Sequence, residues 1–225
     1  VQPAVAREWH AVTGKPIVQG YGLTETSPAA VCNTIDGEFT GSIGLPIPST
    51  EAMIAGDDGN ELEVGEVGEI CLKGPQVMEG YWQRPAETAE VMLPGGWLRT
   101  GDIGRMDESG FIYIEDRKKD MIVTGGENVY STEVENVLYM HPKILEAAVF
   151  GVPDERWGEA VNAAVVLKAG ETATADEIIA FCKEHQAAYK APKAISFLDE
   201  LPKTGSGKIY KKGLRDPFLQ KKSDR

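Results

Sequence analysis

Residues 96–130 hold several side chains of the kinds that bind nucleotides. The stretch reads GWLRTGDIGRMDESGFIYIEDRKKDMIVTGGENVY, with a Thr-Gly-Asp, an Asp-Arg beside a Lys-Lys-Asp, and a Gly-Gly-Glu-Asn-Val in that order. The carboxylate of Asp102, the guanidinium of Arg117, a charged position at Lys119 that suits a swivel, and a glycine loop are close together in the chain. Together they predict a nucleotide site next to a domain boundary.

A second set of candidate ligands lies near the start of the chain, in the sequence Tyr21-Gly22-Leu23-Thr24-Glu25. An aromatic ring can stack on a base, a glycine lets backbone approach a ligand, a hydroxyl can donate a hydrogen bond, and a carboxylate suits Mg²⁺. A plain turn between a strand and a loop could have the same residues. This pentapeptide alone therefore leaves both interpretations open.

The third candidate is Lys208, at the end of the sequence PKTGSGK. Small residues before it would let a loop enter a crowded site, and its long side chain can deliver positive charge to a phosphate or carboxylate. A phosphate-binding P-loop is excluded, because the spacing between the glycines is too short and Ile209 follows the lysine instead of Ser or Thr. A solvated basic tail would explain Lys221 and Lys222 but not the Gly-Ser-Gly.

Composition and charge restrict the function further. The 225 residues are 42% hydrophobic and 26% charged, which is ordinary for one or two globular domains. The net charge of −12 disfavours general binding of nucleic acid or anionic membranes. One stretch without acids nevertheless forms a basic island that suits a phosphorylated small molecule. Its members are Lys203, Lys208, Lys211, Lys212 and Arg215.

Three widely spaced cysteines, at positions 32, 71 and 182, indicate neither a disulfide framework nor a zinc site and favour the reducing cytoplasm. The sequence has no signal peptide and no apolar run of the roughly 18 residues that span a bilayer. Peripheral contact with the inner face of a membrane is compatible with this, and no feature indicates an oligomeric state. Because the chain begins at Val1 instead of Met, we expect it to be a piece of a longer protein.

The pattern of apolar residues predicts an α+β fold in two parts. Between residues 41 and 115, short β-like runs alternate with Gly-rich turns, which is typical of a small barrel or distorted sheet. After residue 119 we expect a compact domain of about three strands flanked by helices. Thr132 with Glu135 predicts one capped helix that stops before Pro142, and Thr174 with Glu177 predicts another. The expected strands are residues 145–152, 160–167 and 194–198.

Five segments match, in order and spacing, the adenylate-forming superfamily of acyl-CoA synthetases, luciferases and peptide-synthetase adenylation domains. They are Tyr21–Thr26, Gly96–Asp102, Asp116–Asp120, Gly125–Val129 and Pro202–Lys208. The resemblance covers nearly the whole chain. Residues 41–51 and 74–82 are most similar to long-chain fatty-acid:CoA ligases. The resemblance implies that residues 1–118 are the last part of the large adenylation domain and residues 119–225 are the mobile C-terminal domain.

The resemblance also implies a two-step reaction with ATP, Mg²⁺ and CoA. A carboxylic acid, expected to be a fatty acid, attacks the α-phosphate to give acyl-AMP and pyrophosphate, and the CoA thiol then displaces AMP. By analogy with the family, Tyr21 beside Gly22 would lie against the adenine. Thr24 would donate to a phosphate oxygen, and Glu25 would hold Mg²⁺.

The remaining roles that the resemblance implies fall in the later motifs. Asp102 would accept both ribose hydroxyls with Arg117 reinforcing it, and Lys208 would stabilise the reacting carboxylate and phosphate. Lys119 would be the hinge about which Lys208 is withdrawn after adenylation. The same rotation would bring a pantetheine-binding loop to the site, formed by Gly125, Gly126 and Glu127.

Two features of the family are not found upstream of Tyr21, where only about 20 residues remain. These are the Ser/Thr/Gly-rich loop that grips the β- and γ-phosphates and most of the acyl pocket. We therefore expect this chain alone to be inactive, and the length of the acyl chain is not indicated. Two alternatives stay open: a non-catalytic fragment that binds a nucleotide or a partner, and an adenylating enzyme that loads the phosphopantetheine of a carrier protein.

Overall fold

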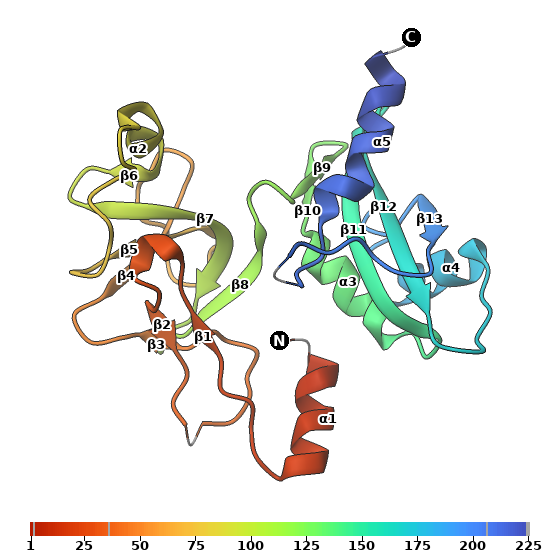
Figure 1. Ribbon diagram of the computed structural model, residues 1–225, viewed down its shortest axis with the longest axis horizontal. Helices are drawn as coiled ribbons and strands as arrows, with labels where there is room; N and C mark the ends of the chain where they lie inside the picture. Colours follow the sequence, from red (N-terminus) through yellow and green to blue (C-terminus); the bar gives the residue numbers. More distant parts are fainter. Residues whose placement is uncertain (2, 36, 206, 224–225) are drawn as a thin grey trace. The chain divides into compact units, whose positions relative to one another are not determined.

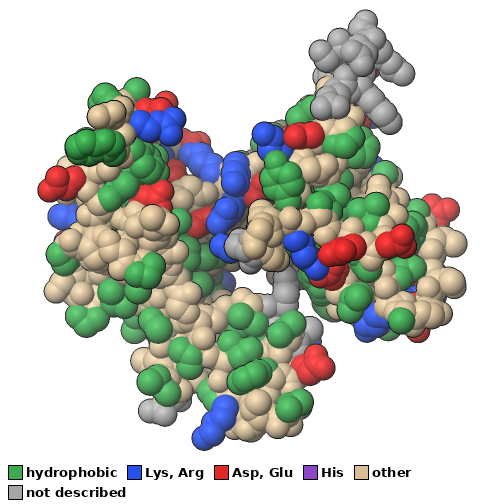
Figure 2. All heavy atoms as spheres, viewed as in Figure 1, with side chains coloured by type: hydrophobic (Ala, Val, Ile, Leu, Met, Phe, Trp, Pro, Cys, Tyr) green, Lys and Arg blue, Asp and Glu red, His purple; other side chains and the backbone are tan. Residues whose placement is uncertain are grey.

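The computed structural model describes residues 1, 3–35, 37–205 and 207–223, and the chain divides into two compact units. The first unit is Val1–Lys118 and the second is Lys119–Arg225. Helices and strands are mixed along the chain (Figure 1), which confirms the predicted α+β class. No helix among the described residues is long and apolar enough to cross a membrane. Figure 2 shows charged side chains of both signs on each unit.

The first unit contains a small antiparallel sheet next to the Tyr-Gly-Leu-Thr-Glu motif. The chain begins with helix α1 (Pro3–Thr13). The sheet then has the order β1-β2-β3. Its strands are β1 (Gly20–Tyr21), β2 (Val31–Cys32) and β3 (Leu45–Pro46), and the short 3₁₀ helix η1 (Thr24–Thr26) connects β1 to β2. Tyr21 therefore lies on a strand, and Thr24 and Glu25 lie on the helix that follows it.

A distorted five-stranded sheet makes up the rest of the first unit, in agreement with the predicted β-rich segment. Its strands are β4 (Glu51–Ala55), β5 (Gly68–Lys73), β6 (Met92–Leu93), β7 (Trp97–Met106) and β8 (Ile112–Arg117). Their order is β4-β5-β7-β6, and β8 also pairs with β7. The helix α2 (Pro85–Val91), which was not predicted, precedes β6. The Thr-Gly-Asp motif lies on β7, which pairs with three of the other strands.

The second unit has a five-stranded sheet, so the expectation of about three strands is wrong. The strands are β9 (Ile122–Thr124), β10 (Glu127–Val129), β11 (Ile144–Asp154), β12 (Gly158–Leu167) and β13 (Ala194–Phe197). Their order is β10-β9-β12-β11, with β13 parallel to β12. The three predicted strands correspond to β11, β12 and β13. The other two are only three residues long on either side of two glycines, which is too short for a clear alternating pattern.

The helices of the second unit are α3 (Ser131–Met140), α4 (Ala175–His185) and α5 (Lys211–Ser223). Thr174 Oγ1 accepts the N–H of Glu177 at 3.2 Å, as predicted for the start of α4. The predicted capping box of α3 is wrong, because its N-cap is Tyr130 and no side chain caps it. Glu135 instead accepts the N–H of Val149 on β11 at 2.8 Å. The helix ends before His141 and Pro142, as predicted.

Both faces of the second sheet are covered. Val149 and Val165 pack with residues of α3 and α4, whereas Phe150 and Ala164 pack with Leu201 and the partly buried side chains of α5. Neighbouring residues of a strand point to opposite faces, so a sheet that is covered on both faces has continuous apolar strands. The long hydrophobic runs of β11 and β12 are explained in this way.

Candidate active site

Asp102 and Arg117 lie opposite each other on neighbouring antiparallel strands. The register of β7 and β8 pairs these two residues directly, and side chains of directly opposed residues are close enough to interact. Arg117 Nε lies 3.4 Å from Asp102 Oδ1. The side chain of Asp102 is 8% exposed and that of Arg117 is 50% exposed. The carboxylate is therefore shielded from water beside a half-exposed cationic partner.

Tyr21 supplies a second contact to the same carboxylate. Its hydroxyl donates to Asp102 Oδ2 at 2.6 Å. Burial raises the pKa of Tyr21, and the charge and hydrogen bond of Asp102 raise it further, so the hydroxyl remains protonated and donates. The structure thus brings together three residues that the sequence singles out at distant positions, Tyr21, Asp102 and Arg117. We call them the Asp102 cluster.

The Thr-Gly-Asp motif forms a bulge in β7. On β5, Glu69 pairs with Ile103, and Cys71, two residues later, pairs with Arg99. One residue of β5 therefore faces residues 100–102 of β7, and the extra residues leave the backbone ladder. Such bulges re-aim side chains and are common next to active sites.

Side chains and a glycine hold this bulge in shape. Thr100 Oγ1 donates to the carbonyl of Ile70 at 2.8 Å and accepts the N–H of Asp102 at 3.2 Å. Gly101 has a φ of +73°, in the left-handed region that glycine adopts without a steric penalty. The bulge therefore presents Asp102 from a defined backbone.

Sequence reasoning missed Glu69, which is buried directly beside the bulge. Its side chain is 5% exposed and accepts hydrogen bonds from the N–H of Gly101 at 3.0 Å and from Arg99 Nη1 at 2.7 Å. Lys118 Nζ lies 3.3 Å from the same carboxylate. The signal that could have found it is a carboxylate inside the otherwise apolar run of β5, since buried charges are rare unless they are paired.

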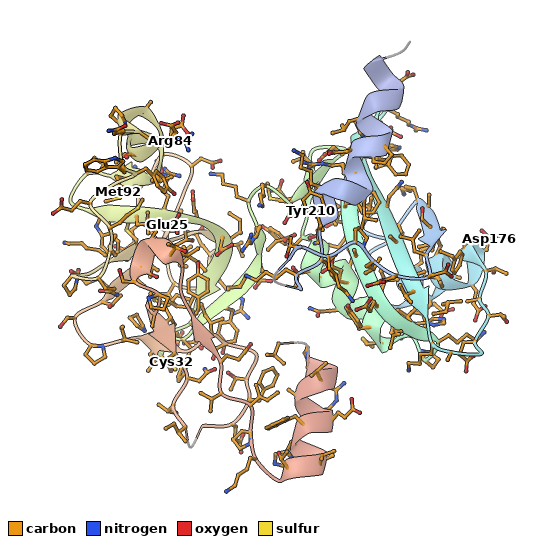
Figure 3. All side chains as sticks on the ribbon, in the orientation of Figure 1. Glu25, Cys32, Arg84, Met92, Asp176 and Tyr210 are labelled. Carbon is orange, nitrogen blue, oxygen red and sulfur yellow. The ribbon has the colours of Figure 1, made fainter. Side chains whose placement is uncertain are left out.

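Glu25 is held by a residue that was also missed. The hydroxyl of Tyr81 donates to Glu25 Oε1 at 2.9 Å, and this hydrogen bond raises the pKa of Tyr81. Glu25, labelled in Figure 3, is partly exposed on η1, and Thr24 beside it is exposed. Within the described part of the chain, no three His, Cys, Asp or Glu side chains form a ready metal cluster. A lone carboxylate still suits Mg²⁺, which takes most of its ligands from phosphates and water.

Gly22 has a structural reason to be glycine. A Cβ at this position would lie 1.6 Å from the carbonyl oxygen of Pro28. The space beside Gly22 is therefore filled by the loop after η1.

A cavity of about 330 Å³ connects the two motifs of the first unit. Its lining includes Glu25 and Tyr81 together with Thr100, Gly101 and Lys118. The motif on η1 and the bulge of β7 therefore border the same space.

Lys119, the predicted hinge, is an exposed turn residue at the start of the second unit. The residue before it is anchored in the first unit. Lys118 Nζ pairs with Asp57 at 2.9 Å and with Glu69 at 3.3 Å, and its N–H donates to the carbonyl of Gly101 at 2.9 Å. The hydrogen bond to Asp57, followed by the Glu69 charge, raises the pKa of Lys118. The anchored segment of the first unit thus extends to the residue before the predicted hinge.

The predicted glycine loop is a two-residue hairpin turn between β9 and β10. Gly125 and Gly126 have φ values of +61° and +86°, and positive φ at both positions is what a type I′ turn requires. A Cβ on Gly125 would lie 3.0 Å from the ring of Trp157, whereas nothing lies within 4 Å of one on Gly126. Free space is therefore found beside the second glycine, and Glu127, also predicted for this loop, begins β10 and is exposed.

Lys208 lies on a tight loop in the second unit. The N–H of Thr204 donates to the carbonyl of Lys208 at 2.7 Å, and the N–H of Lys208 donates to Thr204 Oγ1 at 3.2 Å. Ser206, part of the predicted motif, lies outside the described residues. Lys208 is exposed, and within the described residues its Nζ has no hydrogen-bond or ion-pair partner. The backbone is held while the charged end of the side chain is free.

The basic island is not uniformly available to a ligand. Lys203 pairs with Glu146 on β11 at 2.9 Å, and Lys211 pairs with Glu135 on α3 at 2.8 Å. These two lysines anchor the loop at its two ends. Lys203 and Lys211 are therefore already neutralised by carboxylates, and the expected binding of a phosphate applies to members of the island such as Lys208.

Two protein-family models match the chain. The model of AMP-binding enzymes matches residues 1–82, and the model of the AMP-binding enzyme C-terminal domain matches residues 133–208. The first match includes the Tyr-Gly-Leu-Thr-Glu motif and the second ends at Lys208.

Individual relatives agree with these matches. A long-chain-fatty-acid–CoA ligase of Yersinia pestis is 52% identical over 96% of the chain. ATP-bound MatB from Rhodopseudomonas palustris is 37% identical with a TM-score of 0.91, covering 96% of this chain and 43% of that one. The o-succinylbenzoate CoA synthetase of Bacillus subtilis, in complex with its acyl-adenylate intermediate, is 41% identical with a TM-score of 0.84, covering 93% and 43%.

The chain spans about 38% of the length of the Yersinia ligase. The model of AMP-binding enzymes nevertheless matches residues within the first unit, and the C-terminal-domain model matches residues within the second. The chain belongs to the AMP-binding enzymes.

Proposed function

We propose that the protein is an AMP-forming acid–thiol ligase and that this chain supplies its nucleotide-binding and thiol-transfer parts. The substrates are a carboxylic acid, ATP and CoA, and the products are acyl-CoA, AMP and pyrophosphate. The observation that carries the proposal is the Asp102 cluster, a shielded carboxylate fixed by Tyr21 and Arg117. Such a carboxylate is suited to accept hydrogen bonds from the two hydroxyls of a ribose.

In the first step, a carboxylate oxygen attacks the α-phosphorus of ATP, and the bond to pyrophosphate breaks. Lys208 stabilises the charge that develops on the phosphate oxygens, because its exposed ammonium has no competing partner among the described residues. Thr24 donates to a phosphate oxygen. Glu25 would hold Mg²⁺, which offsets the negative charge of the phosphates when bound. Tyr81 orients this carboxylate through its hydrogen bond.

In the second step, the CoA thiol loses its proton to solvent and its sulfur attacks the acyl carbon. The bond between the acyl carbon and the phosphate oxygen breaks, and AMP leaves with that electron pair. Rotation about Lys119 withdraws Lys208 and presents the turn of Gly125 and Gly126. The open space beside Gly126 supports a role in accommodating the pantetheine arm. Asp102 keeps its hold on the ribose in both steps, because acyl-AMP carries the same ribose as ATP.

The acid is proposed to be a fatty acid. The support is the 52% identity with a long-chain-fatty-acid–CoA ligase over 217 residues. Transfer to free CoA rather than to a carrier protein rests on the same relative.

The test uses the protein expressed from the complete reading frame. Exchange of pyrophosphate into ATP that depends on an added fatty acid is expected, followed by acyl-CoA formation when CoA is supplied. No exchange with any of a series of carboxylic acids would contradict adenylation. Exchange followed by transfer only to a phosphopantetheinylated carrier protein would overturn the choice of CoA.

A further inference from the structure

We propose that Glu69 is a positioning residue that sets the ribose-binding geometry of Asp102 and ties it to the segment before the hinge. This inference rests on the proposed function, because it takes Asp102 as the ribose acceptor. Glu69 lines the cavity beside the bulge, but its hydrogen bonds and ion pairs go to Gly101, Arg99 and Lys118 and not to Asp102. Its effect passes through the bulge of residues 100–102.

The bulge leaves a backbone N–H without a strand partner, and Glu69 accepts its hydrogen bond. Because residues 100–102 leave the ladder between β5 and β7, the N–H of Gly101 needs a substitute acceptor. Glu69 Oε1 accepts it at 3.0 Å. Gly101 directly precedes Asp102, so this bond fixes the backbone from which the ribose acceptor projects.

The other oxygen of Glu69 binds two cations. Arg99 Nη1 lies 2.7 Å and Lys118 Nζ 3.3 Å from Oε2. The side chain of Glu69 is 5% exposed and that of Arg99 is 16% exposed, so this charge pair is poorly screened by water. Removing one member of a buried pair leaves its partner unpaired, which is costly.

The cations come from two places in the chain. Arg99 directly precedes the bulge, and Lys118 is the last residue of the first unit. The N–H of Lys118 also donates to the carbonyl of Gly101 at 2.9 Å. Gly101 is thus held on its N–H by Glu69 and on its carbonyl by Lys118. One carboxylate therefore links the ribose acceptor to the residue that precedes the hinge.

The experiment compares ATP with 3′-deoxyATP in pyrophosphate exchange by the complete protein. Where Asp102 is well placed, loss of one ribose hydroxyl should lower kcat/KM by roughly tenfold, the size of one charge-assisted hydrogen bond. In Glu69→Ala this penalty should shrink several-fold, because a displaced carboxylate gains little from the hydroxyl. A purely structural loss of stability would lower both rates and leave their ratio unchanged.

The matched control is Glu51→Gln, which removes an exposed carboxylate that pairs with Lys73 of the same sheet at 3.6 Å. It should keep the full penalty. If circular dichroism shows that Glu69→Ala does not fold, the same ratio of rates is measured in Glu69→Gln instead. Its amide keeps the shape but loses the charge that holds Arg99 and Lys118, so the penalty should shrink here too, by less than in Glu69→Ala because the amide oxygen can still accept from Gly101.

The outcomes separate the two proposals. No exchange in the unmodified protein would contradict the proposed function. Exchange in the unmodified protein with an unchanged penalty in a folded Glu69 variant would overturn the role of Glu69 alone. A penalty that shrinks in the Glu69 variants but not in Glu51→Gln supports it.

Discussion

The Asp102 cluster and the Lys208 loop are built in opposite ways. Asp102 is shielded, lies across a strand pair from Arg117, and accepts a hydrogen bond from Tyr21. Lys208 is exposed at a loop whose ends are anchored by Lys203 and Lys211, and its ammonium is free of partners among the described residues. A group that must hold one ligand through two steps benefits from a fixed environment. A group that acts in only one step must be free to leave.

The difference also concerns where conformational entropy is lost. The side chain of Asp102 is already ordered before a ligand binds, so little further ordering is needed. The long side chain of Lys208 must be ordered when it acts. The two hydrogen bonds between Thr204 and Lys208 hold the Lys208 backbone, so only the side chain needs to be ordered.

The largest effect is expected from Lys208→Ala in the complete protein. One preorganised charge is worth about 3–4 kcal/mol to a transition state, or about 10²–10³ in rate. Adenylation should fall by this factor, whereas thioester formation from supplied acyl-AMP should stay close to normal. Pyrophosphate exchange and single-turnover transfer measure the two steps separately, and Lys212→Ala on the same basic island is the control.

A smaller effect is expected from Lys119→Pro. This variant tests whether rotation at Lys119 withdraws the Lys208 loop after adenylation. Proline fixes φ near −65°, and holding a residue away from its preferred backbone costs about 1–3 kcal/mol. Thioester formation should therefore slow by about tenfold or more while adenylation changes less. Equal rates for both steps in the variant and in the unmodified protein would argue against a hinge at this position.

The smallest effect is expected from Tyr81→Phe, which removes the hydroxyl that holds the Glu25 carboxylate. Loss of one hydrogen bond to Glu25 is worth about 1 kcal/mol, or about fivefold. The Mg²⁺ concentration for half-maximal adenylation should rise by about that factor, with the maximal rate nearly kept. Tyr113→Phe, a tyrosine that bonds Asp107 instead, should leave the Mg²⁺ dependence unchanged.

The sequence singled out the candidate ribose-binding residues but not the groups that support them. Asp102, Arg117 and Tyr21 were found because they belong to ordered motifs, but their meeting depends on the register of β7 and β8 and on the position of β1. Glu69 and Tyr81 were missed because each acts through a contact more than 30 residues away in sequence. Local patterns do not encode such distances.

Secondary structure shows the same limit. The strong apolar runs of β11 and β12 and the cap at Thr174 were predicted, because their signals are local. The short strands β9 and β10 were not predicted. Each has only three residues, too few for a local pattern, and they form by pairing with each other and, for β9, with β12. Thr132 matched a capping pattern, yet Glu135 forms a tertiary hydrogen bond with β11.

The most direct test of the central claim is to measure both half-reactions in Asp102→Asn beside Lys208→Ala. The account predicts that Asp102→Asn weakens adenylation and thioester formation alike, by about 10- to 100-fold in kcat/KM, because the ribose hydroxyls are held in both. Lys208→Ala should impair adenylation only. Loss of the same single step in both variants, or of both steps in both, would contradict the division between a fixed nucleotide site and a departing lysine.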